Sequence, residues 1–259
     1  MNLNAPTPAS NHAHAPACAA TAAPVSASRR TVDAPTRTFH ALFALSFLGA
    51  YLTAEGERLR LLHVTLGYTL AGLLAFRVVY GLLGPRQVRL SVLLRKLAGL
   101  PAWLRSLQAT APLQTNWRQG QNLVMPLAIL ALLGLAVPLT VSGYGSYNDW
   151  GDWLEDVHEV VGNAFLTVVL AHISLVVVLS LLRRKNLALP MVTGRVPGAG
   201  PNVARHNHGW LAALLLVAVL AFWSWQWQES PNGLLSPQAI QGILRNELGR
   251  ETLTVVPLS

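Results

Sequence analysis

Residues 158–179 read HEVVGNAFLTVVLAHISLVVVL, and this stretch decides the fold class. A helix of this length and composition can cross a bilayer, which needs about 20 mostly apolar residues. His158 and His172 interrupt the apolar run, and their spacing corresponds to about 21 Å of helix rise at nearly the same azimuth. Because an ionisable residue inside a membrane helix is costly, both histidines indicate a functional site.

The composition agrees with a membrane protein. Of the 259 residues, 52% are hydrophobic and 12% are charged, and the mean hydropathy is +0.40. Soluble domains carry about 25% charged residues, so a soluble globular domain is excluded. The single Cys18 excludes an internal disulfide framework, a Cys-rich metal site and c-type haem attachment. The net charge of +8 lies between apolar runs rather than on a solvated basic domain, which argues against nucleic acid as a partner.

We therefore predict an all-α membrane protein, in which a four-helix transmembrane bundle is followed by a fifth, C-terminal transmembrane helix. The predicted crossings are residues 38–54, 62–83, 123–142, 157–182 and 209–227.

Four parts of the chain follow from these crossings. Residues 1–36 are rich in Ala, Pro, Ser and Thr and are predicted to be a disordered cytoplasmic tail. Residues 37–197 form the bundle, and residues 198–227 form a loop and the fifth helix. Residues 228–259 are predicted to be a periplasmic tail with a short amphipathic helix that begins at Ser236 and Pro237.

The positive charges predict the orientation. Most Lys and Arg residues lie before the first crossing, between the second and third, or between the fourth and fifth. The other side carries acids: Glu55, Glu57, Asp149, Asp152, Glu155, Asp156 and Glu159. Because positive residues stay on the cytoplasmic side, we expect a bacterial inner-membrane protein with a cytoplasmic N-terminus and a periplasmic C-terminus.

Residues 88–108 lie between the second and third crossings and alternate Leu and Val with Arg and Lys. This pattern is typical of amphipathic helices on an anionic inner leaflet, and a solvated basic loop explains it equally well.

Four histidines belong to the predicted crossings, and their depths match in pairs. His63 and His158 lie near the outer ends of their helices, whereas His40 and His172 lie nearer the cytoplasm. Two imidazoles from different helices can fill both axial positions of a haem iron. The depths therefore predict two stacked haems, one held by His63 and His158 and the other by His40 and His172.

Glycines and arginines complete the predicted sites. Gly67 and Gly162 each lie four residues after a predicted ligand, and the missing Cβ would let a flat macrocycle approach the backbone. Close helix packing explains such glycines as well. Candidate partners for the haem propionates are Arg58 and Arg60 outside, and Arg37, Arg77 or Arg183 inside. Arg77 could equally extend to the inner interface.

Three stretches carry a resemblance to a known family. They are VDAPTRTFH at 32–40, HVTLGYTLAGLLAFRVVYGLLGPRQVRL at 63–90, and HEVVGNAFLTVVLAHISLVVVLSLLRRKNLALPMVTGRV at 158–196. The chain resembles prokaryotic cytochrome b561 proteins, which include the b-type cytochrome subunits of nickel–iron hydrogenases. The resemblance implies a four-helix haem-binding bundle with two haem b groups and His40, His63, His158 and His172 as axial ligands. It also implies electron transfer between the quinone pool and a redox partner.

The resemblance leaves the partner open. The third predicted crossing begins QGQNLVMPLA and is only loosely similar to the hydrogenase subunits, and the fifth helix extends past the four-helix core. We expect a periplasmic c-type cytochrome or another redox protein, with the chain as a homodimer or as a subunit of a complex.

Two other functions fit parts of the pattern. One is a superoxide:quinone oxidoreductase that acts alone, which some members of the family resemble. The other is a metal or proton transporter lined by the histidines, although Glu159 is the only acid within the predicted crossings. No nucleophile with a neighbouring base supports hydrolytic or transfer chemistry.

Overall fold

A computed structural model describes residues 28–56, 59–109 and 117–230 of the chain. Its helices are α1 (Ala34–Leu52), α2 (Arg60–Leu83), α3 (Leu90–Leu97), α4 (Leu100–Ala109), α5 (Trp117–Tyr147), α6 (Trp153–Arg183), α7 (Leu189–Thr193) and α8 (Gly209–Glu229). Two short strands, β1 (Ser28–Arg30) and β2 (Arg195–Pro197), pair antiparallel. The predominance of helix confirms the all-α prediction.

Four described helices are long and apolar enough to cross a membrane: α2, α5 from residue 119, α6 and α8. Their bounds overlap the predicted crossings at 62–83, 123–142, 157–182 and 209–227. Helix α1 is not among them, since its 19 residues include Arg37 and His40, which lower its hydropathy. A multi-pass membrane protein is therefore confirmed, whereas a five-helix crossing, with α8 as the fifth helix, stays a prediction.

Helix α1 begins four residues before the predicted crossing at 38. Asp33 caps it, because the Asp33 carboxylate accepts a hydrogen bond from the backbone N–H of Thr36 at 3.2 Å, and Pro35 lies in the first turn. His40 therefore lies in the second turn of α1 and not at its beginning. Residues 28–36 were predicted as part of the disordered tail, but residues 28–30 form β1 and residues 34–36 begin α1. Residues 1–27 and the predicted helix near Ser236 lie outside the described residues.

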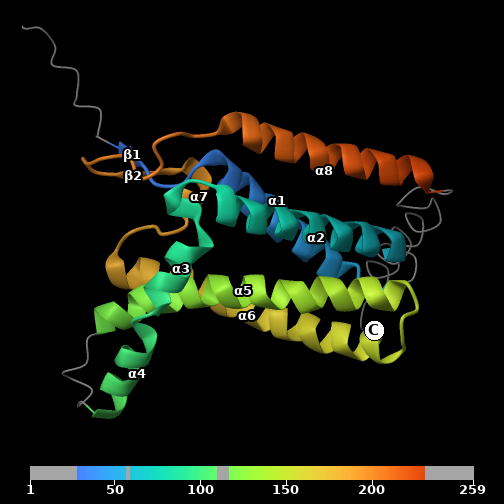
Figure 1. Cartoon of the computed structure of the whole chain (residues 1–259), viewed down its shortest axis with the longest axis horizontal. Helices are drawn as coiled ribbons and strands as arrows, with labels where there is room; N and C mark the ends of the chain where they lie inside the picture. The colour runs from blue at the N-terminus through green and yellow to red at the C-terminus, as the bar shows by residue number, and fades with distance from the viewer. Residues whose placement is uncertain (1–27, 57–58, 110–116, 231–259) are drawn as a thin grey trace, which may run out of the picture.

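Figure 1 shows three layers, with the α1–α2 hairpin between α8 on one side and the α5–α6 hairpin on the other. We call the end that carries β1 and β2 the ribbon end. The end where α1 joins α2 and α5 joins α6 is the loop end. Helix α6 packs closely along α5, whereas it meets α1 and α2 mainly through side chains.

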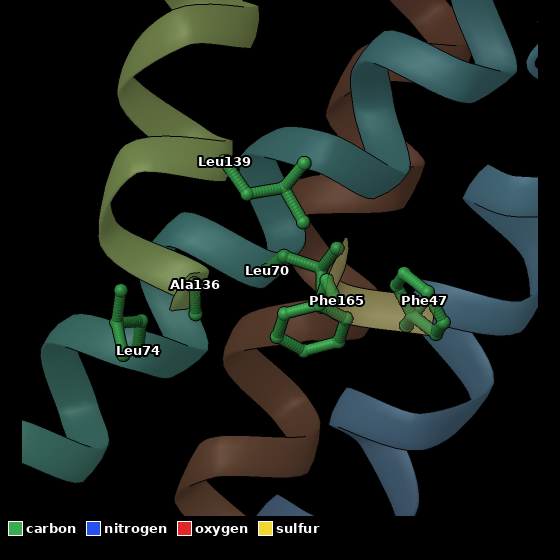
Figure 2. Close-up of a cluster of buried hydrophobic side chains, with 6 residues drawn as sticks. All are labelled: Phe47, Leu70, Leu74, Ala136, Leu139 and Phe165. Carbon is green, nitrogen blue, oxygen red and sulfur yellow. The ribbon is translucent and has the colours of Figure 1, made fainter. Parts of the chain in front are cut away.

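One buried cluster joins the two hairpins between these ends (Figure 2). Its members come from four helices: Phe47, Leu70, Leu74, Ala136, Leu139 and Phe165. The Phe165 side chain is 1% exposed, and its ring centroid lies 4.7 Å from that of Phe47. Because Phe165 lies midway along α6 between His158 and His172, this cluster fills the space between the two histidine depths.

Residues 88–108 are largely helical, which favours the amphipathic-helix prediction over a loop. They make up most of α3 and α4, joined to α2 by a short 3₁₀ turn at Arg86–Val88. Leu94 and Leu104 are exposed, and α3 packs against α5. Contact with a leaflet stays a prediction.

Helix α8 is held on the α1–α2 hairpin by a second cluster and by one hydrogen bond. The cluster contains Phe39, Leu73, Leu215 and Val219. The Trp223 indole N–H donates to the Thr69 hydroxyl at 2.8 Å. Since Thr69 is buried, this bond anchors α8 to the middle of α2.

Replacing Trp223 by Phe should lower the free energy of unfolding by about 0.6–1.7 kcal/mol, the typical to largest value for a side-chain hydrogen bond between membrane helices. Reversible unfolding of the purified chain in mixed micelles would measure the change. Trp225→Phe is the matched control, because the Trp225 side chain is 55% exposed on the same helix. Equal effects of both variants would mean that the bond to Thr69 contributes nothing.

Candidate functional site

The structure brings the four predicted histidines together in two pairs. His63, in the first turn of α2, faces His158 in the second turn of α6, with ring centroids 6.0 Å apart and ring planes at 87°. His40 on α1 and His172 on α6 lie close enough to interact electrostatically. We call the first the loop-end pair and the second the ribbon-end pair.

Backbone carbonyl groups orient both rings of the loop-end pair. His63 Nδ1 lies 2.8 Å from the Ala50 carbonyl oxygen, and His158 Nδ1 lies 3.0 Å from that of Leu139. A carbonyl oxygen only accepts hydrogen bonds, so each Nδ1 carries the proton and donates. The Nε2 lone pair of each ring is therefore free to bind a metal, which is the usual arrangement of histidine ligands.

The spacing of the loop-end pair would suit one metal ion held by both rings. Metal–imidazole bonds are about 2.0–2.1 Å long, so two imidazoles that hold one ion would have ring centres roughly 6 Å apart. The ring centroids of His63 and His158 lie 6.0 Å apart.

The glycines predicted beside this pair leave open space. A Cβ built on Gly67 would meet no heavy atom within 4 Å, and one on Gly162 would meet only Leu139 Cδ1 at 3.8 Å. Neither glycine is therefore needed for close helix packing against a neighbour, and a role of Gly67 and Gly162 beside a macrocycle stays a prediction.

Two residues of α5 shape this site and escaped the sequence analysis. The Ser142 hydroxyl is buried and lies 3.3 Å from His158 Nδ1. A Cβ on Gly143 would lie 2.7 Å from His158 Cε1, so any residue larger than glycine at this position would displace the His158 ring. The one signal in the sequence is the pair of glycines in SGYG at 142–145, and nothing in that stretch points to a histidine on another helix.

The ribbon-end pair is built differently. His172 Nδ1 is buried, and it has no hydrogen-bond partner within the described ranges. Phe43 and Phe39 continue from the central cluster toward His40 along α1, with ring centroids 5.3 Å apart. Phe39 directly precedes His40 in α1, and the His40 side chain is itself exposed.

The predicted propionate partners have varied positions. Arg58 lies outside the described residues, and Arg60 is exposed at the start of α2. Arg77 is 9% exposed, and its Nη1 donates to the Val88 carbonyl at 3.2 Å. It also lies within electrostatic range of Asp33, whose carboxylate accepts a hydrogen bond from Tyr80 at 2.7 Å. Contact of Arg77 with a propionate stays a prediction.

The other two inner arginines also have partners at the ribbon end. Arg37 Nη1 donates to the Val192 carbonyl at 2.8 Å, and Arg183 Nη2 donates to Asn122 Oδ1 at 3.0 Å. Their guanidinium groups lie near the helix ends that flank the ribbon-end pair.

Long apolar helices with histidines paired between them define a multi-pass membrane protein with a candidate metal-binding site. The family model described as prokaryotic cytochrome b561 matches residues 31–194, and the chain belongs to this family. Membership confirms the resemblance drawn from the sequence and makes the chain a haem-binding membrane b-type cytochrome that takes part in electron transfer. Neither a curated protein nor a solved structure matches the chain.

Proposed function

We propose that the chain is an inner-membrane dihaem b-type cytochrome that passes electrons between the quinone pool and a redox partner on the periplasmic side. The facing rings of His63 and His158, with both Nδ1 atoms tied to carbonyl oxygens, carry this proposal. In it, these two residues hold one haem b, and His40 and His172 hold the second. Bound haem supplies one-electron chemistry.

The chain's own residues set the conditions for that chemistry. The carbonyl groups of Ala50 and Leu139 fix the ring tautomers, and Gly143 leaves room for His158. The buried cluster around Phe165 keeps water out of the space between the two pairs. Two haems at this spacing along α6 would lie about 20 Å apart by helix rise.

Charge supports the proposed orientation and the side on which a partner docks. The basic residues of the ribbon end include Arg29, Arg30, Arg195 and Arg205, as expected for a cytoplasmic face. Asp149, Asp152, Glu155 and Asp156 are exposed at the loop end beside His158. Such a surface would steer a basic periplasmic electron carrier, for example a c-type cytochrome, toward the loop-end pair.

Haem content of the purified chain tests the proposal. We expect two haem b per chain by the pyridine haemochrome assay, because two histidine pairs are present. We also expect a reduced-minus-oxidised spectrum of a low-spin b-type cytochrome, and reduction of both haems on adding a quinol. A variant with all four membrane histidines replaced by Ala is the control. A colourless wild-type chain would contradict the proposal, and one haem per chain would contradict its dihaem part.

A further inference from the structure

Helices α3 and α4 leave the bundle at the ribbon end, in the connection between α2 and α5. Figure 1 shows both helices running across the long axis of the bundle, whereas the long apolar helices run along it. Because the long apolar helices cross the bilayer, α3 and α4 lie close to the plane of its surface. Trp103 fixes α4 to α5, since its indole ring occupies the space where a Cβ on Gly120 would lie.

The cations of this connection have no acidic partner nearby in the sequence, because residues 58–148 contain no Asp or Glu. Arg89, Arg95 and Arg105 are exposed, and the Nε of each donates to a backbone carbonyl of its own segment, at 3.0, 3.3 and 3.3 Å. Within the described residues, no group accepts a hydrogen bond from the terminal nitrogens of these arginines or of the exposed Lys96. Four cations therefore have free N–H donors on α3, on α4 and at the start of α3.

Exposed apolar side chains lie beside these cations. Leu94 is 59% exposed next to Arg95, and Leu104 is 48% exposed next to Arg105. The Trp103 indole N–H is buried, and it has no acceptor among the described residues. Tryptophan is typical of the membrane interface, where its ring contacts acyl chains and its N–H can donate to lipid oxygens. Leucine, arginine and tryptophan together are typical of a helix that lies in the membrane interface.

An anionic membrane surface meets all of these requirements. Phosphate oxygens accept hydrogen bonds from guanidinium and ammonium groups, and the upper acyl chains accommodate leucine side chains. We propose that α3 and α4 bind anionic phospholipids, with the four cations on the phosphates of headgroups such as phosphatidylglycerol and with Leu94 and Leu104 among the acyl chains. The site needs neither haem nor electron transfer, so it goes beyond the proposed function.

Fluorescence quenching in lipid nanodiscs tests the inference on the full chain. With Cys18→Ser and Leu104→Cys, the chain carries one fluorophore on α4, in nanodiscs of equal phosphatidylcholine and phosphatidylglycerol with brominated acyl chains on one lipid or the other. We expect several-fold stronger quenching by brominated phosphatidylglycerol. A label at Val217→Cys, which is 60% exposed in the middle of α8, should be quenched equally by both lipids. No quenching at position 104, or equal quenching by both lipids, would overturn the inference and leave the dihaem function intact.

Charge variants of the Leu104→Cys protein test the role of the cations. Adding Arg95→Gln and Lys96→Gln should lower the preference for phosphatidylglycerol by about fivefold for each charge removed. High salt should lower it in the unaltered Leu104→Cys protein as well, because screening weakens the attraction. The matched control, Lys185→Gln with Arg205→Gln, removes two exposed charges outside α3 and α4 and should keep the preference. If both double variants lower the preference equally, or if neither the variants nor salt changes it, the proposed lipid site is wrong.

Discussion

Purified His158→Ala protein is expected to contain one haem in place of two, and His63→Ala should lack the same haem. The two rings face each other across 6.0 Å, so removing either imidazole leaves the other unable to hold iron from both sides. His40→Ala and His172→Ala should share the loss of the other haem. Low-temperature difference spectra and electron paramagnetic resonance, which resolve the two haems, would measure the losses.

His206→Ala is the matched control for this series. His206 lies in the loop before α8, where its ring is 5.8 Å from that of His208, and it belongs to neither membrane pair. Both haems should remain in this variant. If His40→Ala and His63→Ala depleted one common haem and spared the other, the pairing across α6 would have to be abandoned.

A methyl group at Gly143 should weaken binding of the loop-end haem without removing either of its ligands. The added Cβ would lie 2.7 Å from Cε1 and 2.9 Å from Nδ1 of His158, closer than real Cβ contacts allow. Since His158 is fixed by the Leu139 carbonyl on one side, its ring must turn or α5 must move. Overpacking of this kind costs about 1–3 kcal/mol, and disturbing the support of a metal ligand weakens binding by about 10–100-fold.

Gly134→Ala is the internal comparison for Gly143→Ala. Both glycines lie on α5, and a Cβ at Gly134 would meet nothing within 4 Å. The rate of haem transfer to an apoprotein scavenger should therefore rise for Gly143→Ala only, and only for the loop-end haem. Equal transfer rates in the two variants would show that the His158 ring tolerates the added group.

The sequence predicts the elements of this fold well where the signal is hydropathy. Helices α2, α5, α6 and α8 overlap their predicted crossings, because a long apolar run has few alternatives to a membrane helix. The predicted start of α1 lies four residues after the observed one, although Asp33 followed by Ala and Pro35 is a common helix-start signal. The β1–β2 pair was not predicted, since its strands are three residues each and far apart in the sequence.

The partners of the histidines were predictable and their supporting groups were not. Helix rise and chain direction alone match His63 with His158 and His40 with His172 in depth. The carbonyl groups of Ala50 and Leu139 carry no side-chain signal, because every residue has a carbonyl. The role of Gly143 depends on a contact between two helices, which no local pattern encodes.

The division into two hairpins has a consequence for how the molecule assembles. His40 and His63 come from the α1–α2 hairpin, whereas His158 and His172 both come from the α5–α6 hairpin. Neither hairpin contains a complete pair, so each can form before any cofactor is bound. A group bound by both histidines of a pair then joins the two hairpins, and its binding free energy becomes part of the stability of the assembled bundle.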